Sequence, residues 1–320
     1  MAQPTNTFDT YDAVGEREDL MDIIYDISPI ETPFQSNVAR TTAKGTFHEW
    51  QTDALAAAAA NAQVQGDDIA SNSLVATTRL GQHTQISRKA VTISGTLDAV
   101  DKAGRAKETS YQLAKAGREL KRDMELELTQ VGVDSAGTGT TAPTFAGVES
   151  WISTNYSDNG VGTTPGVAAG GTVLTAPTDG TQVTLTEALL KAGIKNAWSA
   201  GGDPRVIMVG GGAKQKISGF SGIATVFKNA PAGQATIVGA ADLYVSDFGE
   251  HQIVPNRFSR DRTVLILDLE MWAVAFLRPI MQLELAKTGD AEKRALLGEY
   301  TLVSRNEAAS AKVADISSAL

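Results

Sequence analysis

The fold is decided by an N-terminal stretch, DLMDIIYDISPIETPFQSNVARTTAKGTFHEW, which runs from Asp19 to Trp50. A short amphipathic run is followed by Pro29 and Pro33, which end any helix and impose an extended path. Residues 1–40 are too irregular to fold alone, yet they carry large apolar side chains that need a surface to cover. We therefore predict an N-terminal arm over residues 1–40 that lies partly on a neighbouring subunit. The residues concerned are Phe8, Tyr11, Ile23, Tyr25, Ile30 and Phe34.

The length and composition fit a folded globular protein. The chain has 320 residues, 42% of them hydrophobic, which is enough for one large core or two smaller ones. It has no cysteine, so disulfides and thiolate metal sites are excluded. No apolar run reaches the ~18 residues of a membrane span, and the first residues lack a signal-peptide pattern, so we expect a soluble protein.

The charge is unevenly distributed. The net charge of −9 argues against a dedicated nucleic-acid-binding domain, because phosphate contacts need a concentrated basic surface. Seven Lys and Arg residues lie from Lys102 to Arg122, and none lies between Arg122 and Lys191. A surface built from the second stretch would repel DNA, although a Gly- and Thr-rich loop that needs few charges explains the same gap equally well.

Residues 41–93 predict an extended β-hairpin. One strand is predicted over Thr46–Trp50 and a second, alternating run over Thr77–Ile93. The alanine-rich segment Ala54–Ala62 and the residues after it would form the tip. The alternative for this segment is a short helical turn, or a tip that acts only as a spacer.

A long amphipathic helix is predicted from Lys107 to Gln130. Its apolar residues recur at three- and four-residue spacing, and charged residues occupy the other faces. The apolar residues are Leu113, Gly117, Leu120, Met124, Leu128 and Val131. At 1.5 Å per residue the helix would be roughly 36 Å long, enough to span a domain. We interpret its apolar face as core packing and not as a groove for a partner.

The rest of the chain divides into three parts. Residues 133–186 are rich in Gly, Thr and Ala, and we expect short strands or a surface insertion there. Three large side chains should anchor this part to the body: Phe145, Trp151 and Ile152. From residue 185 helices and strands alternate, and the first helix should end at Gly201 and Gly202. Residues 251–320 predict a β-rich return.

Eight short motifs are spread along most of the chain. They are DISPIETPF (Asp26–Phe34), EWQTD (Glu49–Asp53), LAKAGRELKRDME (Leu113–Glu125), AGVESWI (Ala146–Ile152), GGDP (Gly201–Pro204), VSDFG (Val245–Gly249), KTGDAEK (Lys287–Lys293) and NEAA (Asn306–Ala309). In this order they resemble the major capsid (major head) proteins of tailed phages of the Hong Kong 97 type, in the branch of the SU-type podophage major head proteins. The resemblance implies an α+β, HK97-like phage capsid fold.

The resemblance also implies a division of the chain. Residues 1–40 would be the N-terminal arm, 41–93 the extended β-hairpin loop, and 94–184 the first part of the peripheral domain, with the spine helix and the Gly/Thr-rich insertion. Residues 185–250 would form the axial domain and 251–320 the peripheral domain return. In a DNA-filled shell, the stretch without Lys or Arg would then face outward or sideways.

The function that the resemblance implies is structural. The chain would self-assemble through pentamers and hexamers into an icosahedral phage head that encloses double-stranded DNA. Implied partners are further copies of the chain, a portal protein, scaffold or decoration proteins, and the packaged DNA, bound non-specifically; no membrane is involved. The protein would reside in the virion after assembly in the host cytoplasm.

Two glycine-rich motifs superficially suggest enzymatic sites. VGGGAK (Val209–Lys214) follows a predicted strand, but it lacks the GxxxxGK[ST] spacing of a phosphate-binding loop. We interpret it as a tight turn from a strand to a helix. GFSG (Gly219–Gly222) is one residue short of a GxSxG nucleophile elbow. The spacing in the first motif therefore argues against nucleotide binding, and the missing residue in the second argues against a serine hydrolase.

The titratable residues suggest no site either. His48, His83 and His251 lack metal-ligand spacing, and the first two lie on the predicted hairpin, where water is hard to exclude. Asp67 and Asp68 are adjacent and would point to opposite faces of a strand, so a solvated loop tip explains them better than a metal site. We nominate no catalytic, cofactor-binding or metal-binding residue and expect no cofactor.

Three hypotheses follow. The leading one is a capsid subunit without enzymatic activity. An encapsulin-like nanocompartment shell protein, which encloses a cargo enzyme, is the alternative with the same fold. A hydrolase or nucleotide-binding enzyme that uses the glycine-rich turns is the hypothesis from another class.

Overall fold

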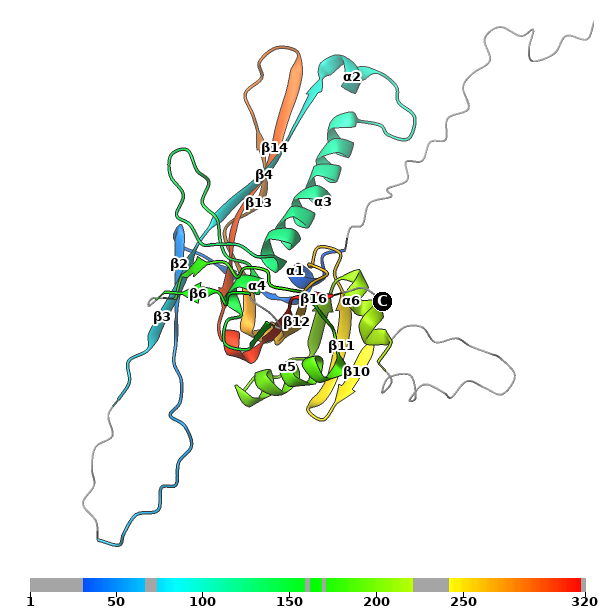
Figure 1. Ribbon diagram of the computed structural model, residues 1–320. Helices are drawn as coiled ribbons and strands as arrows, with labels where there is room; N and C mark the ends of the chain where they lie inside the picture. Colours follow the sequence, from blue (N-terminus) through cyan, green and yellow to red (C-terminus); the bar gives the residue numbers. More distant parts are fainter. Residues whose placement is uncertain (1–30, 67–73, 159–161, 169–170, 221–241, 318–320) are drawn as a thin grey trace, which may run out of the picture.

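Two β-sheets and one long helix form the body, and a hairpin projects from it (Figure 1). The computed structural model describes residues 31–66, 74–158, 162–168, 171–220 and 242–317. The predicted arm before residue 31 lies outside the described residues, with all its large apolar side chains except Phe34. Asp67, Asp68 and the end of the GFSG motif also lie outside them.

The first sheet has four strands in the order β1–β13–β14–β4. Strand β1 (Ala39–Thr42) pairs in parallel with β13 (Trp272–Glu284). Strand β13 pairs antiparallel with β14 (Ala291–Ser304), which pairs antiparallel with β4 (Gln85–Ser94). The short helix α2 (Gly95–Ala99) continues from β4.

Helix α3 (Glu108–Thr129) lies along this sheet, against β4 and β14 (Figure 1). Its ends agree with the predicted helix to within one residue. Leu120, Met124 and Leu128 are fully buried, so the interpretation of its apolar face as core is confirmed. Neither α3 nor any other helix in the described ranges is long and apolar enough to cross a membrane.

The second sheet has six strands in the order β10–β11–β9–β12–β15–β5. The strands are β10 (Leu243–Ser246), β11 (Gly249–Pro255), β9 (Val206–Val209), β12 (Val264–Leu267), β15 (Ala311–Ala314) and β5 (Tyr156–Asp158). Helices α5 (Glu187–Ser199) and α6 (Gly211–Ser218) pack on one face, in a core with Ile207 and Val209. Helix α5 ends just before Gly201 and Gly202, as predicted.

This sheet crosses the predicted boundary between residues 250 and 251. Strands β12 and β15 come from the predicted peripheral return, and β5 comes from the predicted insertion. All four residues of β12 are buried, because Val264 and Ile266 face the helices while Leu265 and Leu267 face the core around α3. A strand buried on both faces needs a central place in a sheet, and β12 takes it between β9 and β15.

The predicted hairpin differs from the observed one in its second strand. Strand β2 (Phe47–Thr52) pairs antiparallel with β3 (Thr78–His83), but the chain then leaves β2, and β4 joins the four-stranded sheet. The switch occurs at Thr84, which is buried and donates its hydroxyl to Glu299 Oε1 (2.8 Å). The predicted strand Thr77–Ile93 is therefore two strands that belong to different sheets.

The Gly- and Thr-rich part contains short strands, as expected, and irregular segments join them. Its anchors Phe145, Trp151 and Ile152 are all buried. The remaining elements are α1 (Pro33–Asn37), α4 (Val148–Trp151), β6 (Gly166–Val167), β7 (Val173–Thr175), β8 (Val183–Thr184), η1 (Leu269–Met271), η2 (Glu307–Ala309) and β16 (Ile316–Ser317).

Two glycines in the quoted motifs permit close crossings of the backbone. A Cβ atom on Gly147 would lie 2.1 Å from the carbonyl oxygen of Gln130, where α4 begins against the end of α3. A Cβ atom on Gly202 would lie 2.2 Å from the carbonyl oxygen of Ala309. The GGDP and NEAA motifs therefore meet in space, and only glycine fits at these two positions.

A buried carboxylate joins three parts of the body. Glu125 on α3 accepts hydrogen bonds from the backbone nitrogens of Phe34 (2.7 Å) and Gln35 (2.9 Å) and from Asn256 Nδ2 (2.8 Å). Burial raises the pKa of Glu125, and these three donors oppose that shift because they stabilise the ionised form. Helix α1 is thereby fixed on α3 and on the end of β11.

A second polar cluster ties the C-terminal strands to the core. Glu149 Oε1 accepts from Thr263 Oγ1 (2.8 Å) and from Arg260 Nη1 (3.3 Å). Lys312 on β15 is also buried, donates Nζ to the carbonyl oxygen of Glu149 (2.5 Å), and lies over the ring of Tyr156 (4.3 Å to its centroid). Burial raises the pKa of Glu149 and lowers the pKa of Lys312 to about 8.

The buried face of α3 can be tested with Leu120→Asp. Leu120 is 1% exposed, so an aspartate there would bury an unpaired charge and cost several kcal/mol, on the order of 3–5. Leu126→Asp on the same helix is the matched control, because Leu126 is 37% exposed. Chemical denaturation should show a folded Leu126→Asp protein and an unfolded or insoluble Leu120→Asp protein. Equal stabilities would show that this face is not core.

The burial of Lys312 predicts a pH dependence of stability. Its folded pKa of about 8 is below the ordinary value of 10.5, so between these pH values the unfolded chain holds a proton that the folded chain has lost. The free energy of unfolding should therefore rise with pH in this window, by at most about 1.4 kcal/mol per pH unit, relative to Lys312→Met.

Urea denaturation of the unassembled subunit at several pH values measures this difference. Lys195→Met, at an exposed position of α5, controls for the loss of a surface charge. The free energy of unfolding of the wild type minus that of Lys312→Met should change with pH above pH 8. A constant value there would contradict the assignment of Lys312 as a buried, destabilised cation.

Candidate functional site

The β2–β3 hairpin carries the most exposed large apolar side chains. Leu55, Val64, Leu74 and Val75 are 99%, 78%, 94% and 87% exposed. They lie beyond the paired part of the hairpin, on the segment that projects from the body (Figure 1). Large apolar side chains that are exposed to this extent are typical of segments that contact another molecule.

The base of the hairpin is held firmly on the body. Trp50 Nε1 donates to the carbonyl oxygen of Ser304 (2.7 Å), and its ring lies 5.9 Å from that of Trp151. The backbone nitrogen of His83 donates to Asp134 Oδ1 (2.7 Å), and His83 Nδ1 lies 2.8 Å from Asp134 Oδ2. The body therefore fixes the direction of the hairpin while its outer part stays uncovered.

A second exposed apolar region lies at the opposite end of the molecule (Figure 1). It comprises the outer part of β13 and the residue after it, with Ile280, Met281 and Leu285 all more than a third exposed. Leu97 on α2 and Val100 just after it are similarly exposed. The two ends of the elongated four-stranded sheet and hairpin thus both offer surfaces for contact.

A third exposed region lies on the six-stranded sheet. The rings of Trp198, at the end of α5, and Phe248, in the β10–β11 turn, are 4.9 Å apart, and Trp198 is half exposed. Leu243 and Val245 on the edge strand β10 are exposed as well. Exposed Trp residues are common anchors of protein–protein contacts.

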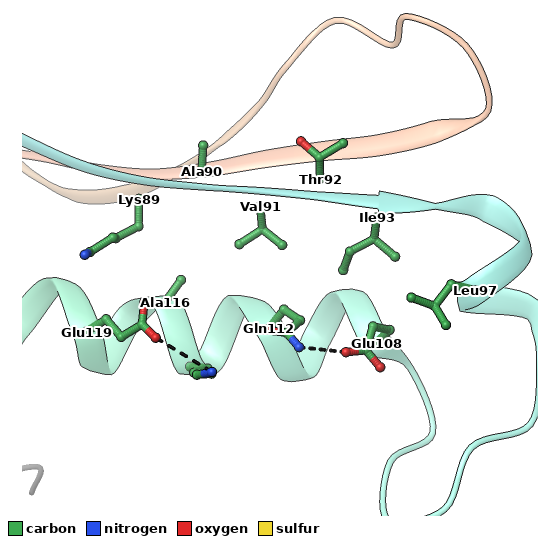
Figure 2. A pocket seen from close by; sticks show the side chains of 11 residues that line it. Lys89, Ala90, Val91, Thr92, Ile93, Leu97, Glu108, Gln112, Ala116 and Glu119 are labelled. Carbon is green, nitrogen blue, oxygen red and sulfur yellow. Dashed lines mark hydrogen bonds and ion pairs between the residues drawn. The ribbon is translucent and has the colours of Figure 1, made fainter. Parts of the chain in front are cut away.

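A groove of about 430 Å³ runs between α3 and β4 (Figure 2). Its polar side chains pair with one another: Gln112 Nε2 donates to Glu108 (2.7 Å), and Lys115 lies 3.9 Å from Glu119. The hydrogen bond from Gln112 contributes most to lowering the pKa of Glu108. The groove therefore offers neutralised charges and no convergent set of catalytic groups.

The three histidines lie on separate elements. His48 is on β2, where burial lowers its pKa, and His83 is bound to Asp134. His251 on β11 is buried, with Nδ1 against the carbonyl oxygen of Pro204 (2.5 Å) and Nε2 against Ser246 Oγ (2.6 Å). Within the described ranges, no three His, Asp or Glu residues form a group that could hold a metal ion.

The Ser246–His251 pair was missed by the sequence analysis. Its five-residue separation across the β10–β11 turn is the signal that could have found it, because the two strands pair there. Ser246 Oγ also accepts from the backbone nitrogen of Phe248 (3.1 Å) and lies 3.3 Å from the carbonyl oxygen of Gly249. These bonds close the turn, so the hydroxyl serves the hairpin and is not presented as a nucleophile.

The glycine cluster of VGGGAK is a strand-to-helix turn, as expected. A Cβ atom on Gly210 would lie 2.1 Å from Asp261 Oδ1, so the glycine makes room for this carboxylate. The same oxygen accepts from the backbone nitrogen of Gly212 (3.3 Å). Lys214 Nζ binds Asp242 Oδ1 (2.9 Å) and the carbonyl oxygen of Ile253 (3.0 Å). A carboxylate thus occupies the start of α6, where a phosphate-binding loop would need its anion.

The known sequences that match this chain are those of major capsid proteins. The family model of the SU10 major capsid protein matches residues 3–317. A major capsid protein of Escherichia phage Phieco32 is 39% identical over 126 residues, which is 39% of this chain and 36% of that protein. The aligned region therefore spans about a third of this curated relative.

Solved structures share the fold over nearly the whole chain. The capsid asymmetric unit of cyanophage A-1(L) has a TM-score of 0.69 at 14% identity and covers 96% of this chain and 98% of its own. A structure from Microbacterium phage Oxtober96 has a TM-score of 0.61 at 12% identity, covering 94% and 96%. The capsid of a native GTA particle has a TM-score of 0.59 at 12% identity, covering 96% and 97%.

At these identities the structural likeness shows the fold, which is the α+β, HK97-like capsid fold that the motifs implied. The match of the family model covers nearly all residues. The chain therefore belongs to the SU10 major capsid protein family.

Proposed function

We propose that this chain is the structural subunit of a phage head and self-assembles into a closed icosahedral shell around double-stranded DNA. The observation that carries the proposal is the hairpin, whose base is fixed while Leu55, Val64, Leu74 and Val75 are uncovered. A second copy of the chain is the occupant that fits best, because repeated contacts between copies cover every hairpin in a closed shell. Family membership supports the same function.

Two of the three exposed regions suit different contacts in this function. The hairpin and the N-terminal arm would reach across neighbours, and α3 would stiffen the body. The edge of the six-stranded sheet, with Trp198 and Phe248, would pack around the five- and six-fold axes. Many such contacts per subunit make individually weak associations collectively strong.

Further partners belong to the same proposal. Non-specifically bound DNA, a portal protein, and scaffold or decoration proteins would complete a head that resides in the virion after assembly in the host cytoplasm. The subunit would have no catalytic role, and the Ser246–His251 pair would serve only to close the β10–β11 turn. Family membership favours this function over the nanocompartment that the sequence analysis left open.

The first test is electron microscopy of the purified protein expressed alone. Hollow closed shells, or pentamers and hexamers in sedimentation, are expected because the hairpin lacks enough local surface to cover. A protein that stays monomeric at all concentrations would contradict the proposal. Absorbance of native particles then separates a packaged genome, with its nucleic-acid spectrum, from a protein cargo.

The role of the hairpin can be tested by limited proteolysis. Elastase cleaves after small apolar residues, and Ala54–Ala60 are exposed, so free subunits should be cut there. In closed shells the same segment would lie on a neighbouring subunit. Elastase could then cut it only when the segment detaches, so cleavage should slow by about an order of magnitude or more. Mass spectrometry of the fragments measures both rates.

The chain provides its own control for this experiment. No Lys or Arg lies between Gly45 and Thr78, so trypsin should leave the segment intact in both states. An unfolded substrate added to both samples reports the elastase activity. Equal elastase rates for the subunit and the shell would remove the intersubunit role of the hairpin while leaving the family assignment standing.

A further inference from the structure

Strand β4 is an edge strand of the four-stranded sheet, and its free edge borders the groove beside α3. The strand pairs with β14 on one side, and no described strand pairs with its other side. Residues 89–93 all line the groove, with Val91 and Ile93 pointing toward α3 and Ala90 and Thr92 pointing away (Figure 2). Side chains of a strand alternate between its two faces, so five consecutive residues line one groove only where the groove follows the edge of the strand. The free backbone of β4 is therefore one wall of the groove, and α3 is the other.

The groove is electrically balanced. Every charged side chain that lines it has a partner of opposite charge. The pairs are Lys89–Asp123 (2.7 Å), Lys115–Glu119 (3.9 Å) and Arg105–Glu108. The other side chains that line the groove are uncharged, and one of them, Leu97 on α2, is 44% exposed. A charged ligand would have to displace these pairs, whereas an uncharged, extended segment would leave them intact.

The hairpin of this chain contains an uncharged segment of this kind. Residues 54–66, ALAAAAANAQVQG, include no charged residue, and all of them are exposed. Alanine has the highest helix propensity, yet residues 54–64 form no helix. The backbone groups of Ala56–Ala60 have no hydrogen-bond partner in the described part of the chain. The backbone of this alanine run is therefore free to pair with the edge of a strand.

The alanine run cannot reach the groove of its own subunit. Thr52 pairs with Thr78, and Ala60 lies eight residues beyond Thr52, a reach of about 29 Å when the chain is fully extended. Val91 lies thirteen residues beyond Thr78 along β3 and β4, about 43 Å at the rise of a strand. Strand β4 also continues away from the tip of the hairpin (Figure 1). A groove that holds this run must therefore belong to a second copy of the chain.

We propose that Ala56–Ala60 of a second copy adds as a strand to the free edge of β4, in the groove beside α3. This inference rests on the proposed function, because assembly brings the hairpin of one copy to the body of another. Main-chain hydrogen bonds provide the affinity in this mode of binding. The edge over residues 89–93 is about 16 Å long, which matches five residues of an added strand. The small alanine side chains let the added strand lie between β4 and α3 without displacing the ion pairs. Because the contact joins two different surfaces, it can close into a ring of subunits.

Disulfide trapping in assembled particles tests the contact directly. The chain has no cysteine, so two introduced cysteines report on one pair of positions. Each residue of Ala56–Ala60 is changed in turn to Cys in one subunit and combined with Ala90→Cys in another. Oxidised shells should contain disulfide-linked dimers of the two variants, because cysteines can be bridged when their Cα atoms lie within about 7 Å. Closed shells without a link to Ala90→Cys from any of the five positions would overturn the proposal.

Ala114→Cys is the matched control for Ala90→Cys. Ala114 is also exposed, but it does not line the groove, and it lies about 200° around α3 from Ala116, which does. The yield of links to Ala90→Cys should exceed the yield to Ala114→Cys severalfold, and equal yields would show random collision and sink the proposal. A link from Ala90→Cys to Thr10→Cys in place of the alanine run would assign the groove to the N-terminal segment of another copy, which also rejects it.

Electron microscopy of the same samples separates this inference from the proposed function. Closed shells that lack the links to Ala90→Cys reject the groove as the binding site and leave the shell function standing. Subunits that form no shells contradict the proposed function, and this inference with it.

Proline substitutions test whether the backbone carries the contact. Successive N–H groups of a strand point to opposite edges, so either Ala57→Pro or Ala58→Pro removes a hydrogen bond to β4. That variant should raise the subunit concentration needed for assembly severalfold. Ala57→Ser and Ala58→Ser keep the N–H group, so both controls should assemble at the wild-type concentration. If both proline variants also assemble at that concentration, the alanine run does not pair with β4 and the proposal fails.

Discussion

The body of the subunit depends on the buried carboxylate of Glu125. Three donors converge on it, two from α1 and one from Asn256 after β11. An ionised carboxylate in a core is costly unless such donors satisfy it, so the three segments can pack there only in one arrangement. The position of α1, the first helix that the structure describes, is thereby fixed on the body.

The two sheets are packed together through a shared core. Leu265 and Leu267 of the six-stranded sheet pack with Trp272 and Tyr300 of the other sheet and with α3. Hydrogen bonds from Thr263 and Lys312 to Glu149 also tie α4 to the six-stranded sheet. The uncovered apolar side chains lie outside it, on the hairpin and at the sheet ends, where they are free to meet other molecules.

The elements that depend on local patterns were predictable from the sequence. The spacing of Leu120, Met124 and Leu128 predicted α3 and its buried face, and Gly201 and Gly202 marked the end of α5. The strand switch at Thr84 and the central place of β12 were not predictable, because they depend on pairing with strands more than 40 residues away. For the same reason, the burial of Glu125, which depends on α1, has only a weak sequence signal. The Ser246–His251 pair has a weak signal for another reason, because its five-residue separation indicates a contact only once the pairing of β10 with β11 is known. The tip of the hairpin was predicted from the sequence, but the exposure of its large apolar side chains became evident only from the structure.

The exposed apolar side chains of the subunit favour one kind of contact. The hairpin between Gly45 and Thr78 has no Lys or Arg, and Leu55, Val64, Leu74 and Val75 are uncovered on its outer part. Contacts through such side chains depend on the burial of apolar area, which the screening of charges by salt does not weaken. Contacts of this kind suit the proposed shell, because its subunits must stay together over a wide range of ionic strength.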